Sequence, residues 1–514
     1  MAVTHNLLPV IINQFTALLL LGSFIFLLLK IRRGSGSGSA KPSDKNVKLP
    51  PCPPRLPVIG HLHHLSGGLA HQMMAKMAKK YGPVMRLQLG QVSAVVISSR
   101  EAAKEVLKVQ DPACADRPES IGTNIVWKAD MVFSPYNDFW RQMRKICIME
   151  LLSAKNVKSF ESVRRDEVSR LLQSIRAAAL AGEAVNVTEK AVGYASSMTC
   201  RAAFGTVGAD KRDVLIDMMK RASTMAGGFE LADLFPSSKL LNILCWNKYR
   251  LNGMRRKVDA ILDVIVDEHR LKRKGEFGGE DTVDVLLRVQ SSGEFEFPIS
   301  NDNIKGVIYD LFSAGTETSS TAMDWAMVEL MRCPRAMARL QAEVREALKG
   351  KETVEEGDLQ KLTYLKWVIK ETLRMHPPVS LIPRACRSDN CTVDGYTIPK
   401  NSKVIINAWS LGRDPKYWDQ PDTFMPERFE NSTVDFLGNS LEFIPFGAGR
   451  RICPGLNFGL ANLVVPLSQL MYHFDWHMPE GVSADDIDLT EEDGLSISRK
   501  NPLFLVPTLY NDGV

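Results

Sequence analysis

The sequence predicts a mainly α-helical protein with small β-sheets, preceded by one N-terminal transmembrane helix. Three observations support this prediction: an apolar run at residues 6–29, helical periodicity over most of 155–290 and 303–332, and short alternating strand-like runs near 84–97 and 392–407. The chain has 514 residues, 24% charged and 45% hydrophobic, which is ordinary for a large globular enzyme. Its net charge of +5 is too mild to indicate nucleic acid binding.

The N-terminal run carries no charged side chain from residue 6 to residue 29 and is followed by Lys30, Arg32 and Arg33. Such a run spans a bilayer as a helix, and the basic flank marks the cytosolic side. A cleaved signal peptide is the alternative, but the run is too long and no Lys or Arg precedes it. We therefore expect residues 1–33 to be an uncleaved anchor that holds a cytosolic body at the endoplasmic reticulum membrane.

A Gly/Ser tether and a proline-rich hinge are predicted at residues 34–60, and a single domain at residues 61–514. Cys52 stands in the hinge. The nine cysteines are scattered singly without a Cys-x-x-Cys pair, which favours a reducing compartment over a disulfide scaffold.

The strongest chemical signal is Cys453, which closes a glycine-rich loop at residues 446–455 and precedes a helical pattern at 457–473. Pro454 is predicted at the first helical position, so that the helix N-terminus lowers the pKa of the Cys453 thiol. A single thiolate does not suit structural zinc but suits haem, whose porphyrin supplies four ligands. A buried cysteine beside a glycine turn is the alternative.

A second signal lies in the helical pattern of residues 303–332, which Ser300 or Asp302 begins and Pro334 ends, giving roughly 45 Å of helix. Its middle contains Gly315 and several hydroxyl residues, which are poor choices for a helix interior. The hydroxyl of Thr318 is predicted to bond the carbonyl one turn earlier and to bend the helix. A merely kinked core helix is the alternative.

Together these motifs resemble the cytochrome P450 monooxygenases. The haem-loop pattern Phe-x-x-Gly-x-Arg-x-Cys-x-Gly matches at every fixed position, and WxxxR, A-G-x-[DE]-T-[ST], ExxR and PERF motifs precede it in the family's order. Taken singly, WxxxR and ExxR would indicate only core packing and a surface ion pair. The resemblance covers essentially the whole chain and is closest to plant microsomal members of the terpenoid-oxidising group.

The resemblance implies a cytochrome P450 fold, with haem b held between the long kinked helix and the cysteine loop. It implies that Cys453 ligates the iron and that Glu317 and Thr318 deliver protons. It also implies arginine and tryptophan contacts to the haem propionates and a buried Glu–Arg–Arg network under the haem loop; these residues are Trp140, Arg144, Arg384 and Arg451 for the propionates, and Glu371, Arg374 and Arg428 for the network.

The implied activity is an NADPH- and O2-dependent oxidation, with electrons from a separate NADPH–cytochrome P450 reductase because the chain has no dinucleotide fingerprint. The resemblance to the terpenoid-oxidising group implies a terpenoid substrate, a sesquiterpene or diterpene. The predicted pocket residues are aliphatic, which by itself favours a small apolar substrate; these residues are Ala314, Val379, Leu381, Ile382 and Ile497. The alternatives are oxidation of a phenolic, flavonoid or alkaloid, a haem-thiolate isomerase or dehydratase, and a non-catalytic haem-binding sensor or membrane scaffold.

Overall fold

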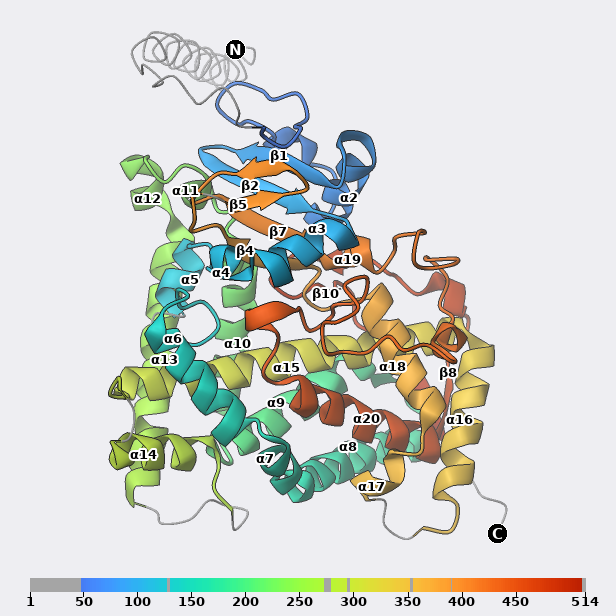
Figure 1. Cartoon of the computed structure of the whole chain (residues 1–514). Helices are drawn as coiled ribbons and strands as arrows, with labels where there is room; N and C mark the ends of the chain where they lie inside the picture. Colours follow the sequence, from blue (N-terminus) through green and yellow to red (C-terminus); the bar gives the residue numbers. More distant parts are fainter. Residues whose placement is uncertain are drawn as a thin grey trace, which may run out of the picture. The chain divides into compact units, whose positions relative to one another are not determined.

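The computed structural model describes residues 48–126, 130–271, 279–293, 296–351, 355–389 and 391–510. Residues from Leu49 onward form one compact unit (Figure 1). The predicted anchor and tether lie outside the described residues and stay predictions. Within the described ranges, no helix is both long and apolar enough to cross a membrane.

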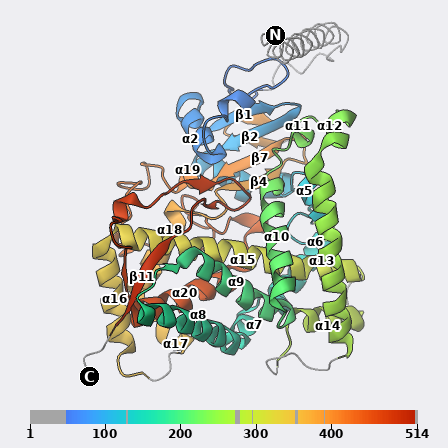
Figure 2. The ribbon, with the colours of Figure 1, turned by 180° about the vertical axis from the view of Figure 1, so that it is seen from behind.

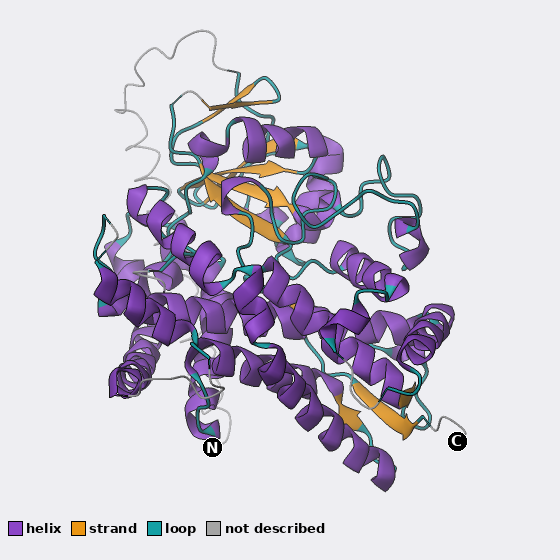
Figure 3. Ribbon diagram, turned by 60° about the horizontal axis from the view of Figure 1, so that its bottom comes forward, coloured by secondary structure: helices purple, strands orange, loops and turns teal. Residues whose placement is uncertain are grey.

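Helices make up most of the body, as predicted (Figure 3). Their bounds are α2 Ala70–Tyr81, α3 Arg100–Lys104, α4 Asp111–Cys114, α5 Ile121–Val126, α6 Asp138–Ile146, α7 Ala154–Ser159, α8 Glu161–Ala181, α9 Val187–Phe204, α10 Ala209–Ala226, α11 Leu231–Leu234, α12 Lys239–Leu244, α13 Trp246–Leu271, α14 Thr282–Ser292, α15 Asn301–Arg332, α16 Pro334–Leu348, α17 Glu356–Leu359, α18 Thr363–Met375, α19 Ala408–Leu411 and α20 Leu456–His473.

The strands of the described residues form four small sheets, with orders β1-β2-β7-β4, β5-β6, β9-β10 and β3-β11-β8. In the largest sheet β2 pairs parallel with β7, although more than 300 residues separate them, and the other pairs are antiparallel. The strand bounds are β1 Val84–Leu89, β2 Val92–Ile97, β3 Val185–Asn186, β4 Leu381–Ala385, β5 Cys391–Val393, β6 Tyr396–Ile398, β7 Lys403–Asn407, β8 Phe474–His477, β9 Glu491–Glu492, β10 Ser498–Arg499 and β11 Phe504–Leu509.

Helix α15 runs through the middle of the body and packs against α9, α18 and α20 (Figures 1 and 2). Ser300 caps it, because its hydroxyl accepts the Asn303 N–H while the Asn303 side chain accepts the Ser300 N–H. Gly315 is needed for close packing, since a Cβ there would lie 3.0 Å from the Thr199 side chain on α9. The helix therefore places its central residues between the core and the loop that precedes α20.

The proline-rich segment is part of the body from residue 49 onward. The carbonyl of Pro51 accepts the N–H of Arg86 on β1 at 2.8 Å, and the carbonyl of Pro53 contacts the ring of His61 at 2.8 Å. Cys52 is exposed between these contacts. The end of the predicted hinge is thus fixed against the largest sheet.

Candidate active site

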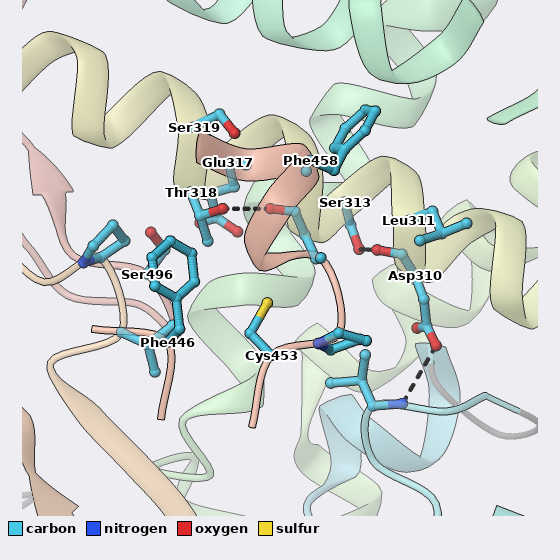
Figure 4. A pocket seen from close by; sticks show the side chains of 18 of the residues that line it. Asp310, Leu311, Ser313, Glu317, Thr318, Ser319, Phe446, Cys453, Phe458 and Ser496 are labelled. Atoms are coloured by element: carbon cyan, nitrogen blue, oxygen red, sulfur yellow. Dashed lines mark hydrogen bonds between the residues drawn. The ribbon is translucent and has the colours of Figure 1, made fainter. Parts of the chain in front are cut away.

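A cavity of about 290 Å³ lies between α15 and the loop that precedes α20. Its walls include six of the seven predicted site residues: Trp140, Arg144, Glu317, Thr318, Arg451 and Cys453. Figure 4 shows the Cys453 sulfur directed toward the side of α15 that carries Glu317 and Thr318. Six of the predicted residues, which are far apart in the sequence, therefore lie around one cavity, while their roles there stay predictions.

Cys453 is held in a tight loop rather than at the first turn of a helix. Its N–H donates to the carbonyl of Phe446 at 2.9 Å. Helix α20 begins only at Leu456, with Gly455 as its N-cap, so the prediction that Pro454 opens the helix is wrong. The loop depends on Gly449, whose φ is +72° and where a Cβ would lie 2.2 Å from the Leu107 carbonyl oxygen.

The predicted lowering of the Cys453 pKa is also wrong for the protein alone. Burial raises the pKa of this thiol, although the Gly455 N–H and the Arg144 charge act in the opposite direction. Desolvation of the thiolate outweighs these two contributions because the sulfur is enclosed by the cavity walls. Metal ligation would supply the missing stabilisation, since a coordinated thiol loses its proton.

The α15 wall carries the two residues predicted to handle protons. The Thr318 hydroxyl donates to the Ala314 carbonyl at 2.6 Å, which confirms the predicted bond; the associated bend stays a prediction. Burial raises the pKa of Glu317 to about 7, opposed by a hydrogen bond with Ser223 on α10 and by the charge of Lys220. Glu317 can therefore hold or release a proton near neutral pH.

Helix α6 supplies the opposite polar wall. The Trp140 indole N–H donates to the Met131 carbonyl at 2.9 Å, and the Arg144 Nη2 donates to the Ile452 carbonyl at 2.5 Å, next to Cys453. Arg451 packs over the Trp140 ring and donates to the carbonyls of Ala115, Val132 and Ser134. These contacts fix the tryptophan and both arginines.

Arg384, which is buried, and Arg117, which is partly buried, complete a cluster of cations. Arg384 lies outside the cavity lining; it donates to the Ala448 carbonyl, and its Nε and Nη1 atoms have no hydrogen-bond partner among the described residues. The pKa of Arg384 is lowered to about 10 and that of Arg451 to about 9, mainly by burial and in part by neighbouring arginines, although nearby aspartates act in the opposite direction. Arg117, whose pKa burial also lowers, reaches the cavity wall. The cluster has more positive charge than its carboxylates balance and suits a ligand with several anionic groups, such as the predicted haem.

Asp310 is a second site residue that the motifs did not indicate. It accepts the N–H groups of Met131 and Val132 and thereby ties α15 to the segment that carries the arginine contacts (Figure 4). Burial raises its pKa well above the ordinary value, and the charge of Asp130 raises it further. A sequence signal existed: Asp310 interrupts an apolar run and lies seven residues before Glu317, on the same helical face. Arg117 gave no such signal.

The aliphatic lining is only partly as predicted. Ala314, Val379 and Ile382 line the cavity, but the predictions for Leu381 and Ile497 are wrong. Leu381 points to the other side of β4 and packs on the core cluster beneath the largest sheet, because neighbouring strand residues face opposite ways. Near the C-terminus the lining residues are Leu495 and Ser496.

The predicted Glu–Arg–Arg network is confirmed. Glu371 accepts two hydrogen bonds from Arg374, both of 2.8 Å, and a third from Arg428 at 2.9 Å. The Glu371 and Arg374 side chains are fully buried. Arg374 also donates to the carbonyls of Gly412 and Pro421, so the network joins α18 to the segment before the cysteine loop.

Comparisons with known proteins agree with this geometry. The family model described as Cytochrome P450 matches residues 50–506. A relative from Mentha piperita, Cytochrome P450 71D13, is 60% identical over 465 residues, which are 90% of this chain and 93% of the relative. Cytochrome P450 71D178 from Origanum vulgare is 53% identical over 502 residues, 97% of this chain and 99% of the relative.

Solved structures show the same fold. Zebra fish cytochrome P450 structures with abiraterone and with progesterone are similar to this chain, with TM-scores of 0.72 and 0.74 and 23% identity in each case. They cover 86% and 85% of this chain and 99% of their own chains.

Proposed function

Since the chain belongs to the cytochrome P450 family and is a monooxygenase of that family, we propose that it oxidises a small apolar terpenoid in plant specialised metabolism, a sesquiterpene or diterpene. The observation that carries the proposal is the cavity. Cys453 lies on one wall, Glu317 and Thr318 lie on another, and aliphatic residues such as Val379 and Ile382 line the space between them. An apolar pocket with a few convergent polar groups favours a small apolar substrate.

The family uses haem b, and its electrons come from NADPH through a reductase. The residues present fit this cofactor, because the Cys453 thiol lines the cavity and two nitrogen atoms of Arg384 have no hydrogen-bond partner among the described residues. In our proposal Cys453 would ligate the iron, and Trp140, Arg144, Arg384 and Arg451 would hold the propionates. When bound, the haem supplies the iron centre at which O2 is activated.

The remaining chemistry falls to the chain's own side chains. Glu317 can take up and release a proton near neutral pH, and its hydrogen bond with Ser223 orients the carboxyl group. The Thr318 hydroxyl donates its proton to the Ala314 carbonyl, so its oxygen is free to accept a hydrogen bond on the cavity side. The apolar lining orients the substrate and limits the water that enters.

We further propose that the predicted helix at residues 6–29 anchors the protein in the endoplasmic reticulum membrane with a cytosolic catalytic domain. The uncharged run and the Lys30, Arg32 and Arg33 flank support this location. A membrane-bound reductase and apolar substrates would then share the same membrane. Fractionation of cells that express the tagged full-length chain tests the location. If alkaline carbonate washing released the protein from the membranes into the soluble fraction, the proposed anchor would be contradicted.

The activity test uses the full chain co-expressed with a reductase in microsomes. The microsomes are supplied with NADPH and matched panels of sesquiterpenes, diterpenes, phenolics and alkaloids, and products are identified by mass spectrometry with labelled O2. Label in a terpenoid product supports the proposal. Products from phenolics or alkaloids alone overturn the substrate class, and product formation without NADPH or O2 indicates an isomerase or dehydratase instead. Microsomes with the reductase alone are the control.

A further inference from the structure

A cluster of three buried cysteines lies outside the active-site cavity. Cys114 ends α4, Cys386 follows β4 and Cys391 begins β5, so distant parts of the sequence contribute to it. The sulfurs of Cys114 and Cys391 are 3.3 Å apart, and all three sulfurs lie within 4.8 Å of one another. Each residue is at most 1% exposed. The cluster therefore presents three thiols to one point in the interior.

The surroundings of the cluster are mainly aliphatic. The three cysteines belong to a core cluster that also contains Val106, Val393 and other buried apolar residues. Hydrogen bonds from Cys114 and Cys391 lower the pKa of Cys386, and the bond to Cys386 raises the pKa of Cys114. The protons are thus unevenly shared, with Cys386 the most readily ionised of the three thiols.

The geometry suits a three-coordinate ion. Thiolates at about 2.3 Å from a common centre are roughly 4 Å from one another, close to the spacing observed. Structural zinc needs a fourth ligand. Across the described part of the chain, no further His, Cys, Asp or Glu atom joins this group, and burial of all three cysteines leaves little room for water. The site therefore favours a soft ion that three sulfurs satisfy.

The net charge of the ion together with its three thiolates decides which of these ions the apolar site favours. Three thiolates around a divalent ion leave one net negative charge in an apolar setting, and a monovalent ion leaves two, which is costly without a partner. A trivalent centre leaves the complex neutral. We propose that Cys114, Cys386 and Cys391 form a binding site for trivalent arsenic.

The chemistry is a ligand exchange without electron transfer. Arsenous acid loses its three hydroxyl groups and forms three As–S bonds, and each hydroxyl leaves as water with one thiol proton. Arsenic stays trivalent, and no oxidant is needed. Entry requires local opening, for which the neighbouring β5–β6 hairpin is suited because each of its strands has three residues.

The test uses the haem-loaded full chain in detergent, kept reduced with a phosphine because dithiols would compete for arsenic. The parent carries Cys52→Ser, Cys245→Ser and Cys333→Ser, which remove the more exposed thiols. After incubation with arsenite and gel filtration, we expect one arsenic atom per chain. X-ray absorption should show three sulfur neighbours, and the thiolate-type Soret band of the reduced CO complex should be retained, which excludes Cys453 as the site.

Single Cys114→Ser, Cys386→Ser or Cys391→Ser changes should weaken arsenic binding by about 10²-fold or more, because two thiols replace three linked ones. Cys200→Ser, which changes a buried cysteine outside the cluster, should bind as the parent does. Unchanged binding in the three variants, an arsenic centre with fewer than three sulfurs, or no uptake by the reduced parent overturns the proposal. Stoichiometric zinc in the purified parent also overturns it. Since none of these readouts uses turnover, they remain informative if the proposed terpenoid oxidation is wrong.

Discussion

The hydroxyl of Thr318 donates a 2.6 Å hydrogen bond to the carbonyl of Ala314, one turn earlier on α15, and both residues face the cavity. We expect Thr318→Ala to lower product formation by about 10²-fold, the usual contribution of a positioned proton-transfer group, while NADPH oxidation falls less. The measurement is the ratio of product to NADPH consumed.

Ser320 provides a matched control for Thr318. It makes the same kind of bond, to the Thr316 carbonyl at 2.9 Å, on the same helix, but it is not among the lining residues. Ser320→Ala should leave the product ratio unchanged, and Thr318→Ser should restore much of it. Equal losses in Thr318→Ala and Ser320→Ala would show that the bond matters only for the helix.

The second prediction concerns pH and Glu317. Burial raises the pKa of this carboxyl from the ordinary 4.5 to about 7, so its protonated fraction falls as the pH rises through neutrality. Turnover of the wild type should therefore show a limb with an apparent pKa near 7, which Glu317→Gln should remove. A Glu317→Gln profile with the same limb would assign the titration to another group.

The same shift affects stability with a definite sign. The folded protein binds the Glu317 proton more tightly than the unfolded chain does. The free energy of unfolding therefore falls as the pH rises from about 4.5 to about 7, and the contribution of Glu317 is constant above that range. Glu317→Gln should consequently gain stability relative to wild type at pH 8 and show little difference near pH 4. Chemical unfolding at the two pH values measures this difference.

Local patterns predicted much of the fold and site. The capped start of α15, the strand at Val84–Leu89 and the pairing of Glu371 with Arg374 follow from short-range spacing, which the sequence displays directly. Five fixed residues around Cys453 carried the family resemblance, and that resemblance implied that the cysteine loop faces the long helix α15. The motifs therefore predicted more of the active-site residues than helix and strand periodicity alone could have predicted.

The parts that were missed depend on long-range packing. Arg117 reaches the cavity wall from a loop, and its neighbours Arg144, Arg384 and Arg451 come from three other segments. The pKa of Cys453 follows from its enclosure by the whole cavity, which no local pattern encodes. Cys114 meets Cys391 across 277 positions, so a search for closely spaced cysteine pairs could not find the cluster.

The third prediction tests the buried Glu371 network. Glu371→Ala leaves Arg374 without its two charge-assisted bonds in a fully buried setting and should lower the free energy of unfolding by about 3–5 kcal/mol. Asp267→Ala is the matched control, because Asp267 and Arg270 form an exposed pair with the same spacing, and it should cost about 0–1 kcal/mol. Denaturant unfolding measures both changes in the free energy of unfolding. Similar losses in Glu371→Ala and Asp267→Ala would contradict the prediction that the buried pair stabilises the fold more than the exposed pair.

The fourth prediction tests Cys453 as the iron ligand. Cys453→Ser should abolish the thiolate-type Soret band of the reduced CO complex and the oxidation activity, because serine does not replace a thiolate that donates electron density to iron. Cys147→Ser changes a buried cysteine outside the cavity lining and should retain the band. A normal band in Cys453→Ser would refute the assigned ligand.

The last prediction separates haem binding from stability at Arg384. Its Nε and Nη1 atoms lack hydrogen-bond partners within the described structure, its nearest carboxylate oxygen, on Asp111, is 4.0 Å away, and burial lowers its pKa to about 10. A buried cation without a close anionic partner destabilises the haem-free chain but suits an anionic propionate. Arg384→Met should therefore speed haem loss by about tenfold or more, while the free energy of unfolding of the haem-free chain stays equal or rises. Arg170→Met on the exposed face of α8 should change neither quantity. Slower haem loss in Arg384→Met would contradict a role of Arg384 in haem binding. Faster haem loss together with a destabilised haem-free chain would show that Arg384 serves the fold rather than the cofactor.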